Sequence, residues 1–260
     1  MGLTRRDFLK LSGGMITLTF LFPKNLYAIA VEIPHLQIPV LMYHDISNDF
    51  KDEYTISPPM FAAQMEWLYS NGYRALSFRE VEGLKERLRE KAVIITFDDG
   101  YATFIEYAFP RLKEYGFRAT INIIGEYVGT FIRHGGNRPM LSWDEYRHII
   151  KSGLIDLGCH TYKLHQWKGS VFSVSEKELE DDLLLFQKIS REETGKSAEI
   201  LAWPYGLYND NAITIAKRRG FKYILTSNEG YLRRDSSLYE IPRLNMNNKR
   251  GLISFQKYIQ

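Results

Sequence analysis

Short apolar segments rich in β-branched residues alternate with helical patterns after residue 30, and this alternation restricts the fold more than any other feature. The expected strands are Pro39–Tyr43, Val93–Phe97, Ala119–Ile124, Ile155–Cys159, Ile200–Trp203, Tyr223–Thr226 and Tyr239–Arg243. Helical connections between strands are typical of parallel sheets, because each connection must return the chain to the same end of the sheet. The sequence therefore predicts an α/β fold with a parallel sheet, either closed as a barrel or doubly wound.

The longest helix is expected over Glu176–Thr194. Ser175 and Glu178 have the spacing of a capping box at its start, and Gly195 is a typical stop at its end. No internal repeat and no Pro/Gly/Ser-rich linker interrupts the sequence after residue 30. We therefore expect a single domain over residues 31–260, in a chain whose 45% hydrophobic content is enough to fill a core.

Residues 1–30 have the three-part layout of a secretory signal: a charged start, a moderately apolar middle and an ending of small residues at Ala28-Ile29-Ala30. The segment TRRDFLK, residues 4–10, also resembles the twin-arginine export consensus. We therefore expect a signal peptide cleaved after Ala30 and a periplasmic or extracellular location in a bacterium; an uncleaved signal anchor is the alternative. The apolar middle is shorter than the roughly 20 residues of a membrane span, so no stable span is expected after cleavage.

The formal net charge of +3 does not indicate a nucleic-acid partner. Residues 1–30 alone carry four basic residues and one acidic residue, so the remaining 230 residues are about neutral. The single cysteine, Cys159, excludes an intramolecular disulfide and a cysteine-rich zinc module. Its position at the end of an expected strand predicts a buried side chain.

Polar and aromatic residues follow four of the expected strands. His44 follows the first strand, Asp98 and Asp99 follow the second, His160 follows Ile155–Cys159, and WPYG at residues 203–206 ends another. In a parallel barrel or a doubly wound sheet, ligands bind beyond these strand ends. Each residue alone also has a structural explanation, since Asp-Asp-Gly is ordinary turn chemistry and a lone histidine is often a satisfied polar residue. One carboxylate with two imidazoles is nevertheless a common ligand set for a catalytic divalent ion.

Three ordered motifs resemble the signatures of the polysaccharide deacetylases, carbohydrate esterase family 4: TFDDG at 96–100, HTYKLH at 160–165 and WPYG at 203–206. The resemblance covers most of residues 38–245. It implies a distorted (β/α)7-type barrel with a single catalytic domain, and metal-dependent hydrolysis of N-acetyl groups on an N-acetylated polysaccharide. The motif histidines are five residues apart rather than the four common in the family. That spacing, with the opening PVLMYHDIS, resembles the branch that acts on poly-β-1,6-N-acetylglucosamine in biofilms.

Other functions remain open from the sequence. Peptidoglycan, chitin oligomers and a lipid-linked sugar are alternative substrates. A catalytically inactive carbohydrate-binding protein is a further alternative. Biofilm members of the family often work beside polymer synthesis and export proteins, which makes such proteins candidate partners, although no docking segment is visible.

The resemblance also implies residue roles. Asp99, His160 and His165 are expected to hold the metal, with zinc favoured and cobalt, nickel or iron able to use the same ligands. Asp98 is expected to be the base, and the backbone N–H of Tyr205 is expected to stabilise the oxyanion. Candidate sugar contacts, for which core packing is an equal alternative, are Trp203, Pro204, Tyr205, Trp167 and Tyr162.

Two parts of the family pattern are not evident in the sequence. The family commonly places a catalytic histidine near the C-terminal strand, but no histidine follows His165. His44 is the expected replacement as general acid, with a proton shuttled both ways by Asp98 as the alternative. The arginine–aspartate pair that tunes the base in the family is also not evident.

Overall fold

The structure is a computed structural model that describes residues 16–22, 25–31, 37–50, 52–84, 91–166 and 169–259. The chain divides into two compact units, residues 1–36 and 37–260. In the first unit, β1 (Ile16–Phe22) and β2 (Asn25–Val31) pair as antiparallel strands. The twin-arginine-like residues 4–10 lie outside the described residues, and cleavage after Ala30 stays a prediction.

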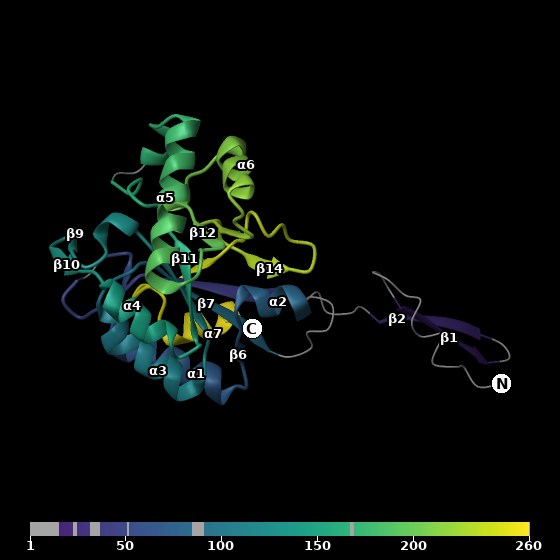
Figure 1. Cartoon of the computed structure of the whole chain (residues 1–260). Helices are drawn as coiled ribbons and strands as arrows, with labels where there is room; N and C mark the ends of the chain where they lie inside the picture. The colour runs from purple at the N-terminus through teal and green to yellow at the C-terminus, as the bar shows by residue number, and fades with distance from the viewer. Residues whose placement is uncertain are drawn as a thin grey trace. The chain divides into compact units, whose positions relative to one another are not determined.

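The second unit is built on a curled, mainly parallel sheet with helices outside it (Figure 1). Its barrel strands, in chain order, are β3 (Gln37–Tyr43), β7 (Ala92–Asp99), β8 (Ala119–Ile123), β11 (Ile155–Cys159), β12 (Ile200–Ala202), β13 (Tyr223–Leu225) and β15 (Leu244–Asn245). Neighbouring strands follow the order β13, β12, β11, β8, β7, β3, and β15 pairs in parallel with β3. Ile241, which lies just before β15 in the sequence, forms an isolated β-bridge with Leu225 of β13. The sheet is therefore a distorted (β/α)7-type barrel, as the sequence predicts.

The closing segment differs from the expected strand Tyr239–Arg243. Only Ile241 of that range pairs, through an isolated bridge, and the strand itself begins at Leu244. Pro242 explains the shift, because proline has no N–H to donate to a ladder of strand hydrogen bonds.

Four further short strands and one hairpin complete the described part of the second unit. β6 (Arg74–Ala75) pairs with the start of β7, and β14 (Tyr231–Arg233) runs antiparallel to β3. β4 (Asp45–Ile46) pairs with β5 (Thr55–Ile56). The hairpin consists of β9 (Phe131–Arg133) and β10 (Asn137–Pro139).

Helix α5 (Glu176–Thr194) has the caps that the sequence indicates. The bounds of the helices are α1 (Pro58–Ser70), α2 (Phe78–Leu84), α3 (Phe109–Tyr115), α4 (Trp143–Ile150), α5 (Glu176–Thr194), α6 (Asp210–Arg218) and α7 (Leu252–Ile259), with short turns η2 (Phe104–Ala108), η3 (Gly125–Tyr127), η4 (Ser170–Phe172) and η5 (Pro204–Gly206). α5 begins with the predicted capping box between Ser175 and Glu178 and ends at Gly195 in the left-handed conformation. Among the described residues, no helix combines the length and apolarity needed to cross a bilayer.

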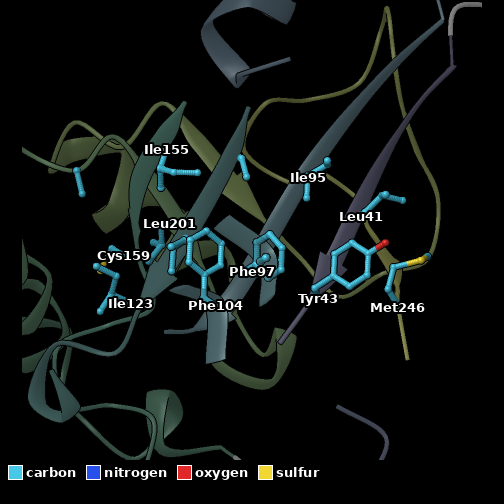
Figure 2. Close-up of a cluster of buried hydrophobic side chains, with 14 of the residues drawn as sticks. Leu41, Tyr43, Ile95, Phe97, Phe104, Ile123, Ile155, Cys159, Leu201 and Met246 are labelled. Atoms are coloured by element: carbon cyan, nitrogen blue, oxygen red, sulfur yellow. The ribbon is translucent and has the colours of Figure 1, made fainter. Parts of the chain in front are cut away.

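Aromatic and aliphatic side chains from adjacent strands fill the core (Figure 2). All eight residues of β7 are buried, as expected for a parallel strand that is covered on both faces. The rings of Tyr43 and Phe97 stack with centroids 5.3 Å apart, and Phe104 meets Phe97 edge-on at 4.9 Å. Cys159 is fully buried, which confirms the sequence prediction. This packing gives the residues at the strand ends a rigid support.

Candidate functional site

A cavity of about 730 Å³ lies at the C-terminal ends of the barrel strands. Seven of the residues that the sequence singles out line it: His44, Asp98, Asp99, His160, His165, Trp203 and Tyr205. They come from the ends of β3, β7, β11 and β12, which meet at this pole of the barrel. The cavity therefore occupies the position at which barrel enzymes bind their ligands.

The backbone turns sharply between Asp98 and Asp99. Neighbouring side chains in an extended strand point to opposite faces of the sheet. Asp99, however, has a φ of 72°, in the left-handed region that non-glycine residues rarely adopt. This turn sends the two adjacent carboxylates to different partners within one cavity. Thr161 and Tyr205 are the other described non-glycine residues with positive φ, and both also belong to the site motifs.

Asp99, His160 and His165 converge on one point. Oδ1 of Asp99 lies 3.5 Å from Nε2 of His160 and 3.6 Å from Nε2 of His165, and the three potential ligand atoms are within 4.8 Å of one another. The Nδ1–H of His160 donates to the carbonyl of Ala202 at 2.8 Å, which leaves Nε2 with its lone pair toward Asp99. Oδ1 of Asp99 is buried and has no hydrogen-bond partner among the residues that the structure describes. The three residues therefore fit a divalent metal ion.

The protonation states of this cluster also suit a metal. Burial lowers the pKa of His160 to about 4, against the opposing effect of Asp98, so its imidazole is neutral at pH 7. Burial would raise the pKa of Asp99, but the neighbouring imidazoles of His165, His44 and His160 lower it below its ordinary value. A neutral imidazole and an ionised carboxylate are the forms that bind metals.

Arg243 donates hydrogen bonds to both carboxylate oxygens of Asp98. Its Nη1 donates to Oδ1 at 2.8 Å and its Nη2 donates to Oδ2 at 2.7 Å, while Nδ2 of Asn122 donates to Oδ1 at 2.7 Å. Burial would raise the pKa of Asp98, but the Arg243 guanidinium outweighs it and holds the pKa well below its ordinary range. Asp98 is therefore ionised and firmly oriented beside the cluster of Asp99, His160 and His165.

The arginine–aspartate pair that is not evident from the sequence is thus present. Its signal in the sequence is Arg243 itself, a charged residue inside the apolar run IPRLNM beside an expected barrel strand. An arginine in such a place must find a buried counter-charge. The sequence could indicate that need, but it could not identify Asp98 as the partner.

The other predicted site residues have clear places in the cavity lining. His44 lines the cavity, and its Nδ1 is buried without a hydrogen-bond partner in the described part of the chain. Tyr205 has a φ of 57°, and its ring stacks on His165 with centroids 4.6 Å apart. Trp203 is only 1% exposed but also lines the cavity, and its indole Nε1 lacks a partner among the described residues. All three can therefore meet a ligand.

Two candidate sugar contacts do not reach the described cavity lining, and a third lies outside the described residues. Pro204 is buried in η5 and is absent from the lining. The ring of Tyr162 packs over Gly125, where an added Cβ would collide with it, rather than facing the cavity. Trp167 lies outside the described residues. The structure therefore gives no support for sugar contacts by Pro204 or Tyr162.

The β9–β10 hairpin forms a cavity wall that no pattern in the sequence indicates. Phe131 and His134 line the cavity from this hairpin. Arg138, which is 2% exposed, ties the hairpin to the β4–β5 region by ion pairs with Asp45 at 3.1 Å and with Asp52. Asp45 and Arg138 are 93 residues apart, so no local pattern links them.

Known proteins resemble this chain in sequence and in fold. The sequence profile described as polysaccharide deacetylase matches residues 85–224. The poly-β-1,6-N-acetyl-D-glucosamine N-deacetylase of Staphylococcus aureus (strain N315) is 32% identical over 210 residues, which cover 78% of this chain and 71% of that protein. The structure of IcaB from Ammonifex degensii matches with a TM-score of 0.76 and 27% identity, over 86% of this chain and 97% of that one. A de-N-acetylase from Aggregatibacter actinomycetemcomitans matches with a TM-score of 0.72 and 25% identity, over 85% and 99% of the two chains.

Proposed function

Because this chain belongs to the polysaccharide deacetylase family and is an enzyme of that kind, we propose that it removes N-acetyl groups from poly-β-1,6-N-acetylglucosamine outside the cytoplasm. The observation that carries the proposed reaction is the convergence of Asp99, His160 and His165 beside the ionised Asp98. The choice of polymer is supported by the named activity of the staphylococcal relative and by the five-residue spacing of the histidines. The signal-like residues 1–30 support export, through the twin-arginine route.

The proposed metal is zinc, held by Asp99, His160 and His165. Two nitrogen donors and one oxygen donor suit zinc, although cobalt, nickel and iron use the same ligands. When bound, such an ion lowers the pKa of a coordinated water from 15.7 towards about 7 and polarises a carbonyl oxygen.

The chain's own residues then supply the proton transfers. Asp98 takes a proton from the water whose oxygen attacks the acetyl carbon, and the backbone N–H of Tyr205 donates to the carbonyl oxygen as negative charge develops there. His44 gives a proton to the sugar nitrogen as the carbon–nitrogen bond breaks. The products are acetate and a free amine on the sugar. Arg243 and Asn122 keep Asp98 oriented throughout.

Removal of the metal is expected to abolish acetate release from a β-1,6-linked N-acetylglucosamine oligomer. The purified protein is stripped with a chelator and then supplied with zinc, cobalt, nickel or iron, one at a time, while acetate is measured. We expect one or more of these ions to restore acetate release, because chelation removes the cation and leaves its ligands in place. Acetate release from chitin oligomers and from peptidoglycan fragments is measured in parallel. Faster release from either would overturn the proposed polymer and leave the reaction in place, whereas a protein that binds metal and deacetylates none of these glycans would contradict the proposed reaction.

His44 provides a test of the proposed general acid. The change His44→Gln is expected to lower kcat by about 10²–10⁴-fold with little change in metal affinity, because glutamine cannot deliver the proton. The matched control is His134→Gln, in a second histidine of the same cavity whose ring lies 5.5 Å from that of Tyr54. Its effect on kcat is expected to be much smaller. Equal kcat values for the two variants would remove His44 from the mechanism.

A further inference from the structure

The turn between His160 and His165 is held from one side by η3. Thr161 starts this turn in the left-handed conformation, with a φ of 64°. Its carbonyl accepts from the N–H of Gly125 at 3.1 Å, and the carbonyl of Tyr162 accepts from the N–H of Glu126 at 2.8 Å. These two hydrogen bonds hold the backbone carbonyl groups of the turn in place.

Asp182 holds the same turn from the opposite side. Its Oδ1 accepts from the backbone N–H of Tyr162 at 2.7 Å, and its Oδ2 accepts from the backbone N–H of Lys163 at 2.9 Å. Asp182 lies on α5, the long helix that packs beside β11 (Figure 1). The turn therefore has its donors and its acceptors bound by two different elements of the barrel wall.

Asp182 is an unusual residue for its position on α5. It lies on the buried stripe of the helix with Leu179, Leu183 and Phe186, and it is itself only 3% exposed. An aliphatic side chain would suit such a stripe, because a buried carboxylate is costly unless it is fully hydrogen-bonded. The two backbone N–H groups of the turn provide the needed hydrogen bonds. The carboxylate of Asp182 therefore serves to hold the turn and is not required by the packing of the helix.

We propose that Asp182 is a positioning residue, which fixes the His160–His165 turn so that both imidazoles face Asp99 and which thereby sets the metal affinity. This inference rests on the metal site of the proposed function. A turn with four residues between its ligands has many conformations, and only a few of them bring both Nε2 atoms to one point. Side chains that orient metal ligands in this way typically change metal affinity by about 10–100-fold when they are replaced.

The change Asp182→Asn tests the inference with little change in shape. Its amide oxygen still accepts from one N–H of the turn, but its NH₂ group faces the other N–H and cannot accept from it. We expect the affinity of the full chain for Zn²⁺ and Co²⁺ to fall by about 10–100-fold. We expect kcat at saturating metal to change much less, because Asp182 does not line the cavity. Affinity is measured without substrate, by competition with a chromophoric chelator and by the Co²⁺ absorption spectrum.

Asp181→Asn is the matched control, because Asp181 is the neighbouring, exposed aspartate of α5 and pairs with Lys177 at 2.7 Å. Its metal affinity is expected to equal that of the wild type. Wild-type affinity in folded Asp182→Asn would overturn the inference, whereas a wild-type chain that binds none of these ions would overturn the metal site of the proposed function instead. If Asp182→Asn does not fold, the inference is tested instead by hydrogen exchange of the backbone amides in the metal-free wild type. The Tyr162 and Lys163 amides are then expected to be protected, and free exchange at both would overturn the inference.

Discussion

Replacement of Asp98 by asparagine is expected to lower kcat for acetate release by about 10²–10⁴-fold, because the amide cannot accept a proton from the attacking water. Metal affinity is expected to stay close to that of the wild type, since the three ligands Asp99, His160 and His165 are untouched. The measurement is a pair of titrations: acetate release against substrate concentration at saturating metal, and metal binding without substrate. A loss of kcat with intact metal binding separates the base from the metal ligands.

The same variant needs a check of its folding. The introduced asparagine would fill the space of the aspartate but leave Arg243 buried without a counter-charge, and an unpaired buried charge destabilises a fold. Circular dichroism and thermal unfolding of the metal-loaded variant establish that the rates refer to folded protein. Full activity in a folded Asp98→Asn protein would show that another group takes the proton.

Replacement of Arg243 by methionine is expected to lower the free energy of unfolding by about 3–5 kcal/mol. The methionine chain fills much of the space, but Asp98 then keeps a negative charge in the barrel with Asn122 as its one hydrogen-bonded side-chain partner among the described residues. Urea unfolding at pH 7 gives the change in free energy. The double variant Asp98→Asn/Arg243→Met is the matched control, because it removes both charges. It is expected to regain part of the stability lost in Arg243→Met, and strictly additive losses would contradict a coupled pair.

The loss in Arg243→Met is also expected to depend on pH. In the wild type, the folded pKa of Asp98 lies below its ordinary value of 3.8, so the stabilisation is fully present above about pH 4 and is lost as the pH falls through the folded pKa. Without Arg243, burial raises the folded pKa of Asp98, and its ionisation then destabilises the variant at neutral pH. The difference in stability is therefore largest near pH 7 and narrows towards pH 4. A difference that grows on acidification would contradict this account of the pair.

The parallel sheet and the meeting of Asp99, His160 and His165 at its strand ends could be predicted because their signals are local, whereas closure as a barrel was implied by the family resemblance. Each strand is a short apolar run between helical patterns, and α5 begins and ends at the capping box and glycine that mark it in the sequence. The predicted ligands His160 and His165 lie in one short motif, and the Asp98-Asp99 pair directly follows an apolar run. The turn that separates Asp98 from Asp99 agrees with the two different roles expected for them, although the positive φ itself was not predicted.

The parts that escaped prediction depend on which distant segments meet. Asp98 and Arg243 are 145 residues apart, and their pairing follows from β15 joining β3 beside β7. The sequence makes Tyr162 a candidate sugar contact, with core packing as an equal alternative. The left-handed Thr161 before it and the Asp182 carboxylate direct its chain onto η3. A motif shows which residue types occur together in the sequence. It does not show which way each side chain turns once the backbone leaves the extended conformation.

The closing strand of the barrel is among the later parts of this sequence to leave the ribosome. A nascent chain that stops before residue 239 already contains both aspartates and both histidines of the site, but it has no guanidinium to neutralise Asp98. Enclosing that carboxylate alone is costly, so closure of the barrel along the C-terminal half of β3 is unfavourable before Arg243 is in place. Closure of the barrel around Asp98 is therefore expected to wait for residues 241–245. Until then the C-terminal half of β3 has an open edge, and open strand edges favour aggregation.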